Sequence, residues 1–500
     1  MDISSVFHID ADKLFEVLTY SRQAPLIFSS GLFLFLFLFF SLGYYFLRNT
    51  AVFRCFYTIL FSCYFYYKTS GWFVFLLLLV SASDYLLAYR IHTSKVRSER
   101  LTTLIISIVI NLGLLCYFKY TDFFRQMIAD LTDQPFHPLN IFLPVGISFF
   151  TFQSLSYTID IYRKQLRPLR NLYDYTFFVT FFPQLVAGPI VRARDFIPQM
   201  QEKIFISKEM FGTGIFLIMA GLFKKAVISD YISVNFVERI FDEPTLYSGL
   251  ENLFGVYGYA LQIYCDFSGY SDMAIGLALL LGFKFKMNFD SPYKSATVTE
   301  FWRRWHISLS AWLRDYLYIP LGGNRKGKVR MYINLFLTML LGGLWHGASL
   351  QFLFWGTFHS LALIIHKIYR TIVPKAQNLG QNMHPAVRIL GILFTFHLVC
   401  FGWVFFRAET FHKAIEMLTH IWSNFHPELL IDFIVGYKYV CLLMLLGFVL
   451  HFVPKRIENK VRTLMIKTPV WAQALLMALL IIFVMQIKSS EVQPFIYFQF

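Results

Sequence analysis

The chain has 500 residues, of which 57% are hydrophobic and only 15% charged, and it contains 58 phenylalanines. A water-soluble protein of this size cannot bury that much apolar surface in one core. The composition therefore excludes a disordered chain, a nucleic-acid-binding module and a secreted disulfide scaffold. It predicts an all-α polytopic membrane protein in contact with the lipid bilayer. The net charge of +15 fits cytoplasmic loops, where Lys and Arg collect, better than a nucleic-acid surface.

The apolar runs follow one another along the whole chain, with no long linker and no internal repeat. We therefore expect one integral-membrane domain over 1–500, with N-terminal spans in 1–140, a catalytic core in 141–370 and C-terminal spans in 371–500. The acidic first 20 residues carry no basic region of a cleavable signal peptide. About twelve runs have roughly the length that crosses a bilayer, although one of them is short. They cover 26–47, 51–67, 71–90, 101–118, 141–161, 211–233, 252–281, 331–345, 350–368, 386–406, 432–452 and 469–487.

Four basic loops predict the orientation of these spans. If the runs are threaded alternately, the loops at 90–100, 163–170, 325–330 and 455–467 all fall on one side of the membrane. The positive-inside rule makes that side cytoplasmic and places the N-terminus outside.

Two segments do not have the sequence pattern of a simple transmembrane helix. Residues 174–190 are apolar but broken by prolines and a glycine, which predicts a re-entrant segment buried in protein. Residues 298–320 place Trp302, His306, Leu309 and Leu313 on one helical face among charged residues. We therefore expect a half-buried or interfacial helix that begins at a capping box, ends near Pro320 and does not cross the membrane.

Intramembrane histidines are the first candidates for chemistry. The sequence contains no GxSxG elbow, Walker loop, HExxH or GxGxxG motif, and its six cysteines show no zinc-binding spacing, so we expect no metal site. His346 lies between apolar runs and is flanked by glycines, which favours a cavity-facing position. His306 is a second candidate, because imidazole is the natural general base near neutral pH. From the residues alone, both could equally be structural.

Two aspartates, Asp266 and Asp272, lie inside an apolar span and need partners. We expect them to pair with the arginines of 303–314 rather than to take a direct part in catalysis. His359 and His366 fall on one face of a span, where we expect ordinary contacts with neighbouring helices.

From about residue 140 to 500, the sequence resembles the membrane-bound O-acyltransferase (MBOAT) family. The similarity is to the bacterial branch that includes the alginate O-acetyltransferase membrane subunit and the teichoic-acid D-alanyl transfer protein. The matching motifs are LPVGISFFTFQSLSYTIDIYR (143–163), FFPQLVAGPIVR (181–192), DFSGYSDMAIGLALLLGF (266–283), NFDSPYKS to NRKG (288–327), LLGGLWHGA (340–348) and PFIYFQF (494–500).

The resemblance implies a ring of about 11–12 tilted transmembrane helices, with re-entrant and interfacial helices around a central funnel. It places the family's signature histidine on His346, as the base that activates an acceptor hydroxyl, and the second polar position on His306. Other positions in or beside these motifs are then expected to line the substrate path: Trp305, Asp272, Arg304, Arg314, Asp315 and Gln184.

The reaction implied by the resemblance is transfer of a small acyl group, usually acetyl, from a cytoplasmic thioester to an extracytoplasmic, alginate-like polysaccharide. Acetyl-CoA is the expected donor, with no resident cofactor. A periplasmic partner of the SGNH-esterase type and a location in the bacterial inner membrane are also implied.

Three other functions remain open at this stage. The family offers D-alanyl transfer to a teichoic-acid-type polymer as its other reaction. Broken helices and buried acids also occur in transporters and channels, although no inverted repeat is found here. The third possible function is that of a structural subunit that only recruits the esterase-like partner.

Overall fold

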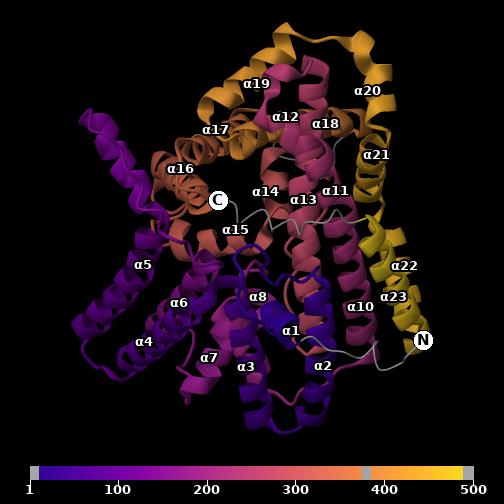
Figure 1. The fold of residues 1–500 in the computed structure, drawn as a ribbon. Coiled ribbons are helices and arrows are strands. Elements are labelled where there is room, and N and C mark those ends of the chain that lie inside the picture. Colours follow the sequence, from indigo (N-terminus) through magenta and orange to yellow (C-terminus); the bar gives the residue numbers. More distant parts are fainter. Residues whose placement is uncertain (1–10, 374–383, 488–500) are drawn as a thin grey trace, which may run out of the picture. The chain divides into compact units, whose positions relative to one another are not determined.

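The computed structural model describes residues 11–373 and 384–487, and every regular element in these ranges is a helix (Figure 1). The chain divides into two compact units. The first contains residues 1–118, 140–187 and 192–204, and the second contains 119–139, 188–191 and 205–500. The closing motif at 494–500 and the first acidic residues lie outside the described residues.

The first unit is built from short and medium helices. They are α1 (Ala11–Leu18), α2 (Gly31–Leu47), α3 (Ala51–Ser70), α4 (Val74–Thr93), the first part of α5 (Arg97–Leu131), α6 (Ile147–Tyr162), α7 (Leu172–Thr180), α8 (Phe182–Leu185) and α9 (Ala193–Gln201).

Phenylalanine rings form the core of this unit around Phe182. Its ring centroid lies 5.0–6.4 Å from six other phenylalanine rings of α2, α3 and the segment before α2, namely Phe28, Phe33, Phe37, Phe40, Phe61 and Phe65. Tilted and edge-to-face pairs of this kind are favourable beyond the area that they bury. The phenylalanine-rich run near residue 35 thus supplies packing as well as a lipid-facing surface.

The proline-broken segment at 174–190 consists of α7, the single turn of α8 and an irregular stretch, rather than one continuous helix. Pro183 lies in the first turn of α8, where a missing N–H costs no hydrogen bond. Residues 177–190 are all buried, as expected for irregular backbone that protein must cover.

The second unit contains the remaining helices. They are the end of α5, α10 (Lys208–Leu222), α11 (Asp230–Ile232), α12 (Glu238–Asp242), α13 (Gly249–Leu280), α14 (Val298–Arg304), α15 (Ile307–Leu313), α16 (Gly327–His346), α17 (Leu350–Ile372), α18 (Pro385–Arg407), α19 (Phe411–Ser423), α20 (Leu430–Gly436), α21 (Lys438–Phe452), α22 (Lys455–Lys467) and α23 (Val470–Ile487).

Helices α10 and α13 run side by side and touch backbone to backbone (Figure 1). A Cβ built on Gly276 would lie 2.6 Å from the carbonyl oxygen of Gly214, and one on Gly269 would lie 2.7 Å from that of Gly221. In each helix the two glycines are two turns apart. Small residues at such crossings let helices in a membrane pack at short range.

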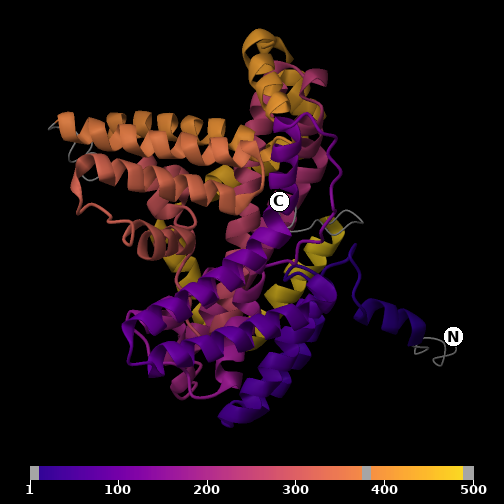
Figure 2. The same ribbon diagram turned by 90° about the vertical axis from the view of Figure 1, so that its left-hand side faces the viewer.

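Helices α16, α17 and α18 form a second group within this unit (Figure 2). The first two cross at Gly343 and Gly356, where a Cβ on Gly356 would lie 2.6 Å from the carbonyl oxygen of Met339. This crossing fixes the end of α16, which carries His346.

The expectation of one continuous helix over 298–320 is wrong. The chain forms α14, leaves the helix at Trp305 and His306, resumes as α15 and ends in a π-helical turn at Arg314–Tyr318. The predicted start is confirmed, because the Thr297 hydroxyl accepts a hydrogen bond from Glu300 N at 3.1 Å. The Glu300 carboxylate bonds to Ala296 N rather than to Thr297 N. Neither seven-residue helix is long enough to cross a bilayer.

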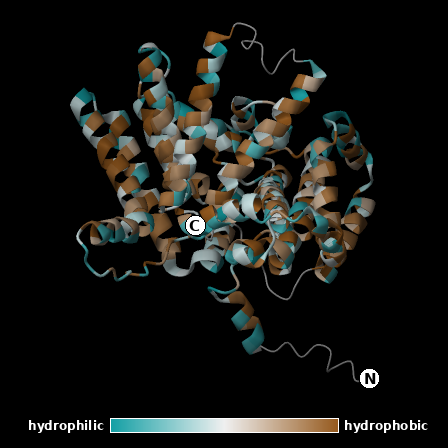
Figure 3. Cartoon of the chain, turned by 90° about the horizontal axis from the view of Figure 1, so that it is seen from above, coloured by the Kyte–Doolittle hydropathy of each residue, from teal (hydrophilic) through white to brown (hydrophobic). Residues whose placement is uncertain are grey.

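Hydrophobic residues line most of the helices (Figure 3). By length and composition, five helical stretches of the described residues can cross a membrane, or six if the bent pair Pro427–Gly436 and Lys438–Phe452 is one span. The five stretches are Ala51–Thr93, Arg97–Leu131, Lys208–Asp242, Pro385–Arg407 and Val470–Ile487. The other expected spans correspond to helices such as α2, which are apolar but shorter, or to helices that are more polar. The chain is therefore an all-helical, multi-pass membrane protein.

Replacing Gly276 by alanine is expected to destabilise the contact between α10 and α13. The new methyl group would meet the carbonyl of Gly214 at 2.6 Å, and overpacking of this kind costs about 1–3 kcal/mol. Gly113→Ala is the matched control, because nothing lies within 4 Å of its Cβ position. Thermal unfolding in detergent should show a lower midpoint for Gly276→Ala alone, and equal midpoints would contradict the assignment.

Single cysteines at Arg303 and Lys326, both exposed, should react with a membrane-impermeant reagent from the same side of the membrane. The reason is that the segment between them lacks a helix long enough to cross. By the positive-inside rule that side is cytoplasmic. A cysteine at Glu428 serves as the opposite-side control on a background without the six native cysteines. Labelling of 303 and 326 from opposite sides would refute this topology.

Candidate active site

His346 is the last residue of α16, and its side chain is buried at 3% exposure. Its ring centroid lies 5.0 Å from Trp345, 5.1 Å from Trp355 and 5.2 Å from Phe406. The imidazole therefore faces protein rather than lipid. That it also meets a water-accessible cavity stays a prediction.

Tryptophan rings gather near this histidine from four helices, α14, α16, α17 and α18, and from the break between α14 and α15. We call Trp302, Trp305, Trp345, Trp355 and Trp403 the tryptophan cluster. Between ring centroids, Trp305 lies 4.9 Å from Trp403. Trp355 lies 5.9 Å from Trp403 and 5.6 Å from Trp302. More than half of the chain's nine tryptophans thus gather around one site. Trp305, expected to line the substrate path, belongs to this cluster.

His306 occupies the break between α14 and α15, and it is fully buried. Its backbone is left-handed, with φ 41° and ψ 56°, a conformation that costs energy for a residue other than glycine and is found at functional sites. Its ring stands edge-on to Phe267 at 4.6 Å. The break thus turns the imidazole into the protein interior.

Asn288 holds this kink in place, and it is only 1% exposed. Its side-chain oxygen accepts hydrogen bonds from Ser308 N at 3.1 Å and Ser308 Oγ at 2.8 Å, and it lies 3.3 Å from His306 Nδ1. Its amide nitrogen donates to Ser271 Oγ of α13 at 3.1 Å. One side chain therefore ties the kink to the long buried helix.

A single indole brings the two histidines together. Trp345 lies 5.0 Å from His346 and 6.0 Å from His306, measured between ring centroids. Residues that are 40 positions apart in the sequence thus share one aromatic neighbour. The shared catalytic role that the resemblance implies for the two histidines stays a prediction.

The glycines beside His346 serve the approach of α17 rather than that of a substrate. A Cβ on Gly347 would overlap the ring of Phe352, and one on Gly343 would meet the backbone of α17. Only Gly342 is loosely surrounded, with Leu313 Cδ1 at 3.2 Å.

The expected pairing of the buried aspartates with the arginines of 303–314 is wrong. Asp272 pairs with Lys224 at 2.6 Å and Asp266 pairs with Lys225 at 2.7 Å. Both lysines lie in a π-helical turn, Phe223–Ser229, that follows α10. Helix α10 packs directly on α13, and the turn that follows α10 also contacts α13. The two lysines of this turn therefore lie beside the aspartates.

The arginines find other partners. Arg304 pairs with Glu300 at 2.9 Å and Asp290 at 3.5 Å. Arg314 donates to Asp315 at 2.7 Å, and this hydrogen bond raises the pKa of the guanidinium.

Gln184 is fully buried in the first unit, where its amide donates to the carbonyl of Phe178. For Asp272, Arg304, Arg314, Asp315 and Gln184, a place along the substrate path stays a prediction.

The sequence predicts only ordinary contacts with neighbouring helices for His359. It is fully buried in α17, and its ring lies 4.8 Å from Trp355 and 5.2 Å from Trp302. Among the described residues, neither of its ring nitrogens has a hydrogen-bond partner, and the same holds for His306 Nε2, Trp302 Nε1 and Trp355 Nε1. Buried polar atoms are nearly always hydrogen-bonded, so this concentration gives the tryptophan cluster the capacity to hold a polar group.

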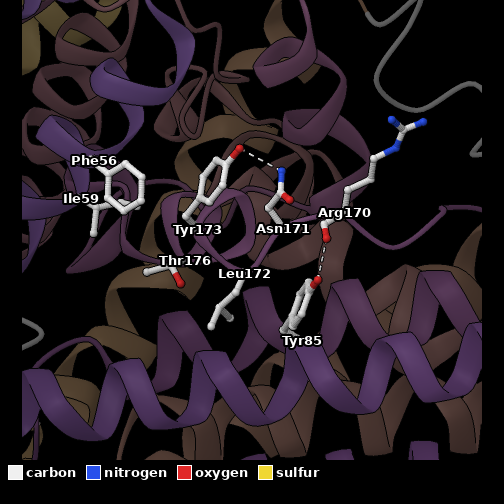
Figure 4. A pocket seen from close by; sticks show the side chains of 8 residues that line it. All are labelled: Phe56, Ile59, Tyr85, Arg170, Asn171, Leu172, Tyr173 and Thr176. Atoms are coloured by element: carbon white, nitrogen blue, oxygen red, sulfur yellow. Dashed lines mark hydrogen bonds between the residues drawn. The ribbon is translucent and has the colours of Figure 1, made fainter.

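A separate pocket of about 580 Å³ lies in the first unit (Figure 4). Figure 4 shows Tyr173 bonded to Asn171, and the Tyr85 hydroxyl bonded to the backbone of Arg170. The lining residues are Phe56, Ile59, Tyr85, Arg170, Asn171, Leu172, Tyr173 and Thr176, none of which is a histidine or a cysteine. This pocket therefore offers no base comparable to His346.

In the described part of the chain, no group of three His, Cys, Asp or Glu residues is placed to hold a metal ion.

Comparison with known proteins gives consistent matches. The model of the MBOAT, membrane-bound O-acyltransferase family, matches residues 102–407. A probable alginate O-acetylase of Pseudomonas aeruginosa is 42% identical over 407 residues, which cover 80% of this chain and 75% of the relative. A peptidoglycan O-acetyltransferase of Helicobacter pylori is 36% identical, with 81% of each chain covered. A teichoic acid D-alanyltransferase of Bacillus subtilis is 32% identical over 56% of this chain and 72% of its own length.

Substituting Asn288 by alanine should loosen the kink at His306. The change removes the acceptor of Ser308 and leaves buried groups unsatisfied, at a cost of about 1–3 kcal/mol each. We expect a lower thermal midpoint and a loss of enzyme activity. Asn235→Ala, which removes one hydrogen bond to the carbonyl of Tyr231, is the control. An Asn288 variant as stable and active as that control would contradict this role.

Proposed function

The chain belongs to the membrane-bound O-acyltransferase family, and we propose that this O-acyltransferase carries an acetyl group across the membrane for O-acetylation of an extracytoplasmic polysaccharide. The observation that carries the proposal is the pair of buried imidazoles, His346 and His306, which share Trp345 as a neighbour. A base and a second polar group beside it are what hydroxyl activation requires.

Acetyl is favoured over D-alanyl as the acyl group. The relatives named as O-acetylases or O-acetyltransferases align with 80% or more of the chain at 36–42% identity. The two named as D-alanyltransferases align with only 53–56% of it at 29–32% identity. An alginate-like polysaccharide is the final acceptor that we favour, because five of the relatives are named as probable alginate O-acetylases. Glycan strands of peptidoglycan are the second candidate, on the strength of the Helicobacter pylori relative.

In the proposed reaction, His346 takes the proton of the acceptor hydroxyl while the hydroxyl oxygen attacks the thioester carbonyl carbon. The bond from that carbon to sulfur breaks, and the imidazolium returns its proton to the departing thiolate. His306, which also lies beside Trp345, orients or polarises the hydroxyl. The unsatisfied polar atoms of His359, Trp302 and Trp355 give the surrounding cluster hydrogen-bonding capacity for the reacting groups.

The donor that we propose is acetyl-CoA on the cytoplasmic side of a bacterial inner membrane. The N-terminus would then lie outside, as the basic loops indicate. Because no part of this chain resembles an esterase, a periplasmic partner of the SGNH-esterase type would pass the acetyl group on to the polysaccharide.

His346→Ala should abolish acetylation of the acceptor while the protein accumulates in the membrane. Loss of a positioned general base typically lowers the rate by about 10²–10⁴-fold. His306→Ala should impair transfer less, because water can partly replace an orienting group. The measurement is ester-linked acetate per unit of exopolysaccharide and, separately, per unit of isolated peptidoglycan, with the protein quantified by blot.

His412→Ala is the matched control, because that side chain is 82% exposed and pairs with Glu416 within its own helix. Acetate lost from one polymer identifies it as the acceptor. Retained acetylation in the His346 variant would refute the catalytic role and favour a transporter or a recruiting subunit. Loss of the protein itself would assign that histidine a structural role.

A further inference from the structure

We propose that Lys119 and Tyr120 of α5 are positioning residues that hold the backbone of His346, an inference that rests on the proposed function of that histidine. The Lys119 ammonium donates to the carbonyl oxygens of Trp345 and His346, both at 2.8 Å. The Tyr120 hydroxyl donates to the carbonyl oxygen of Leu344 at 2.7 Å. Two adjacent side chains thus bind three successive carbonyls.

These carbonyls need partners because they end a helix. The last four carbonyls of an α-helix have no intrahelical donor, and many helices satisfy them with a left-handed residue that turns the following N–H groups back. Here Gly347 is extended instead, with φ −162° and ψ 156°, so the chain leaves the helix without folding back on it. Side chains of α5 supply the donors.

The positive charge of Lys119 also suits the carbonyl end of α16. The carbonyl end of a helix carries partial negative charge, and a nearby positive side chain stabilises it. Residues 97–131 form one of the helices that can cross a membrane, where a lysine is costly unless it has partners or a function. If packing alone mattered, an apolar side chain of similar length would serve better at this position.

The restraint acts on the reacting residue itself. Trp345, Trp355 and Phe406 limit where the His346 ring can point, but they do not fix the backbone from which it projects. On the other side of the turn, the Phe352 ring occupies the place of a side chain at residue 347. Lys119 and Tyr120 hold this backbone through three of its carbonyl oxygens. Small misplacement of a reacting group lowers turnover strongly without weakening substrate binding.

The test uses membranes that contain the full chain, with transfer of radiolabel from acetyl-CoA to the cell's own polysaccharide as the assay. Lys119→Met, which keeps the length and removes the charge, should lower kcat by about 10-fold or more per folded protein, with KM for acetyl-CoA within about 2-fold. Lys119→Arg, which keeps a donor, should retain most of kcat. Tyr120→Phe should lower kcat by about 3-fold, because one of three bonds is lost. Arg97→Met, an exposed change on the same helix, should leave both constants unchanged.

The split between kcat and KM and the rescue by arginine separate positioning from a purely structural role, which would change only the amount of folded protein. Lys119→Met with wild-type kcat, alongside an inactive His346→Ala, overturns this inference and leaves the proposed function standing. An active His346→Ala instead refutes the proposed function. If Lys119→Met does not accumulate, Tyr120→Phe decides, and a wild-type kcat in that variant overturns the inference.

Discussion

Backbone groups that leave a helix inside a membrane protein must find hydrogen-bond partners in the protein itself, and the candidate site is built around this constraint. The chain leaves regular helix at both histidines. At His306, Asn288 binds the residues that follow the kink. At His346, the donors come from α5. Each imidazole thus lies at an irregular point of the backbone that a polar side chain from elsewhere in the sequence supports.

The aromatic residues serve the two units differently. In the first unit, phenylalanine rings pack around Phe182 and fill a core with purely apolar groups. In the second unit, tryptophans surround the histidines and bring indole N–H groups into the interior. An indole combines a large apolar face with one donor, so it can exclude water and still bind a polar atom. The high aromatic content of the chain is therefore not explained by contact with lipid alone.

Much of this arrangement could be predicted from the sequence. Composition predicted the all-helical membrane class, and the proline-broken run predicted a buried irregular segment. The motifs at 288–327 and 340–348 indicated the two histidines as candidates, and the structure places both beside Trp345. The kink at His306 could not be predicted, because residues 298–313 carry a regular helical pattern and the break depends on Asn288, a residue outside that pattern. The partners of Asp266 and Asp272 were mispredicted for a similar reason. The contact between α10 and α13 decides which cations reach them, and sequence proximity to the arginines does not.

The glycine contacts between α10 and α13 also limit how this part of the molecule can move. A single close contact would let two helices pivot about it, but these helices meet at two points that lie two turns apart. Two such points fix the crossing angle and the register together. The two contacts therefore restrict movement of α10 relative to α13. Asn288, which is hydrogen-bonded to Ser271 on α13, links the His306 kink to this helix pair. The His306 kink is therefore held to the part of the second unit that the glycine contacts restrain most.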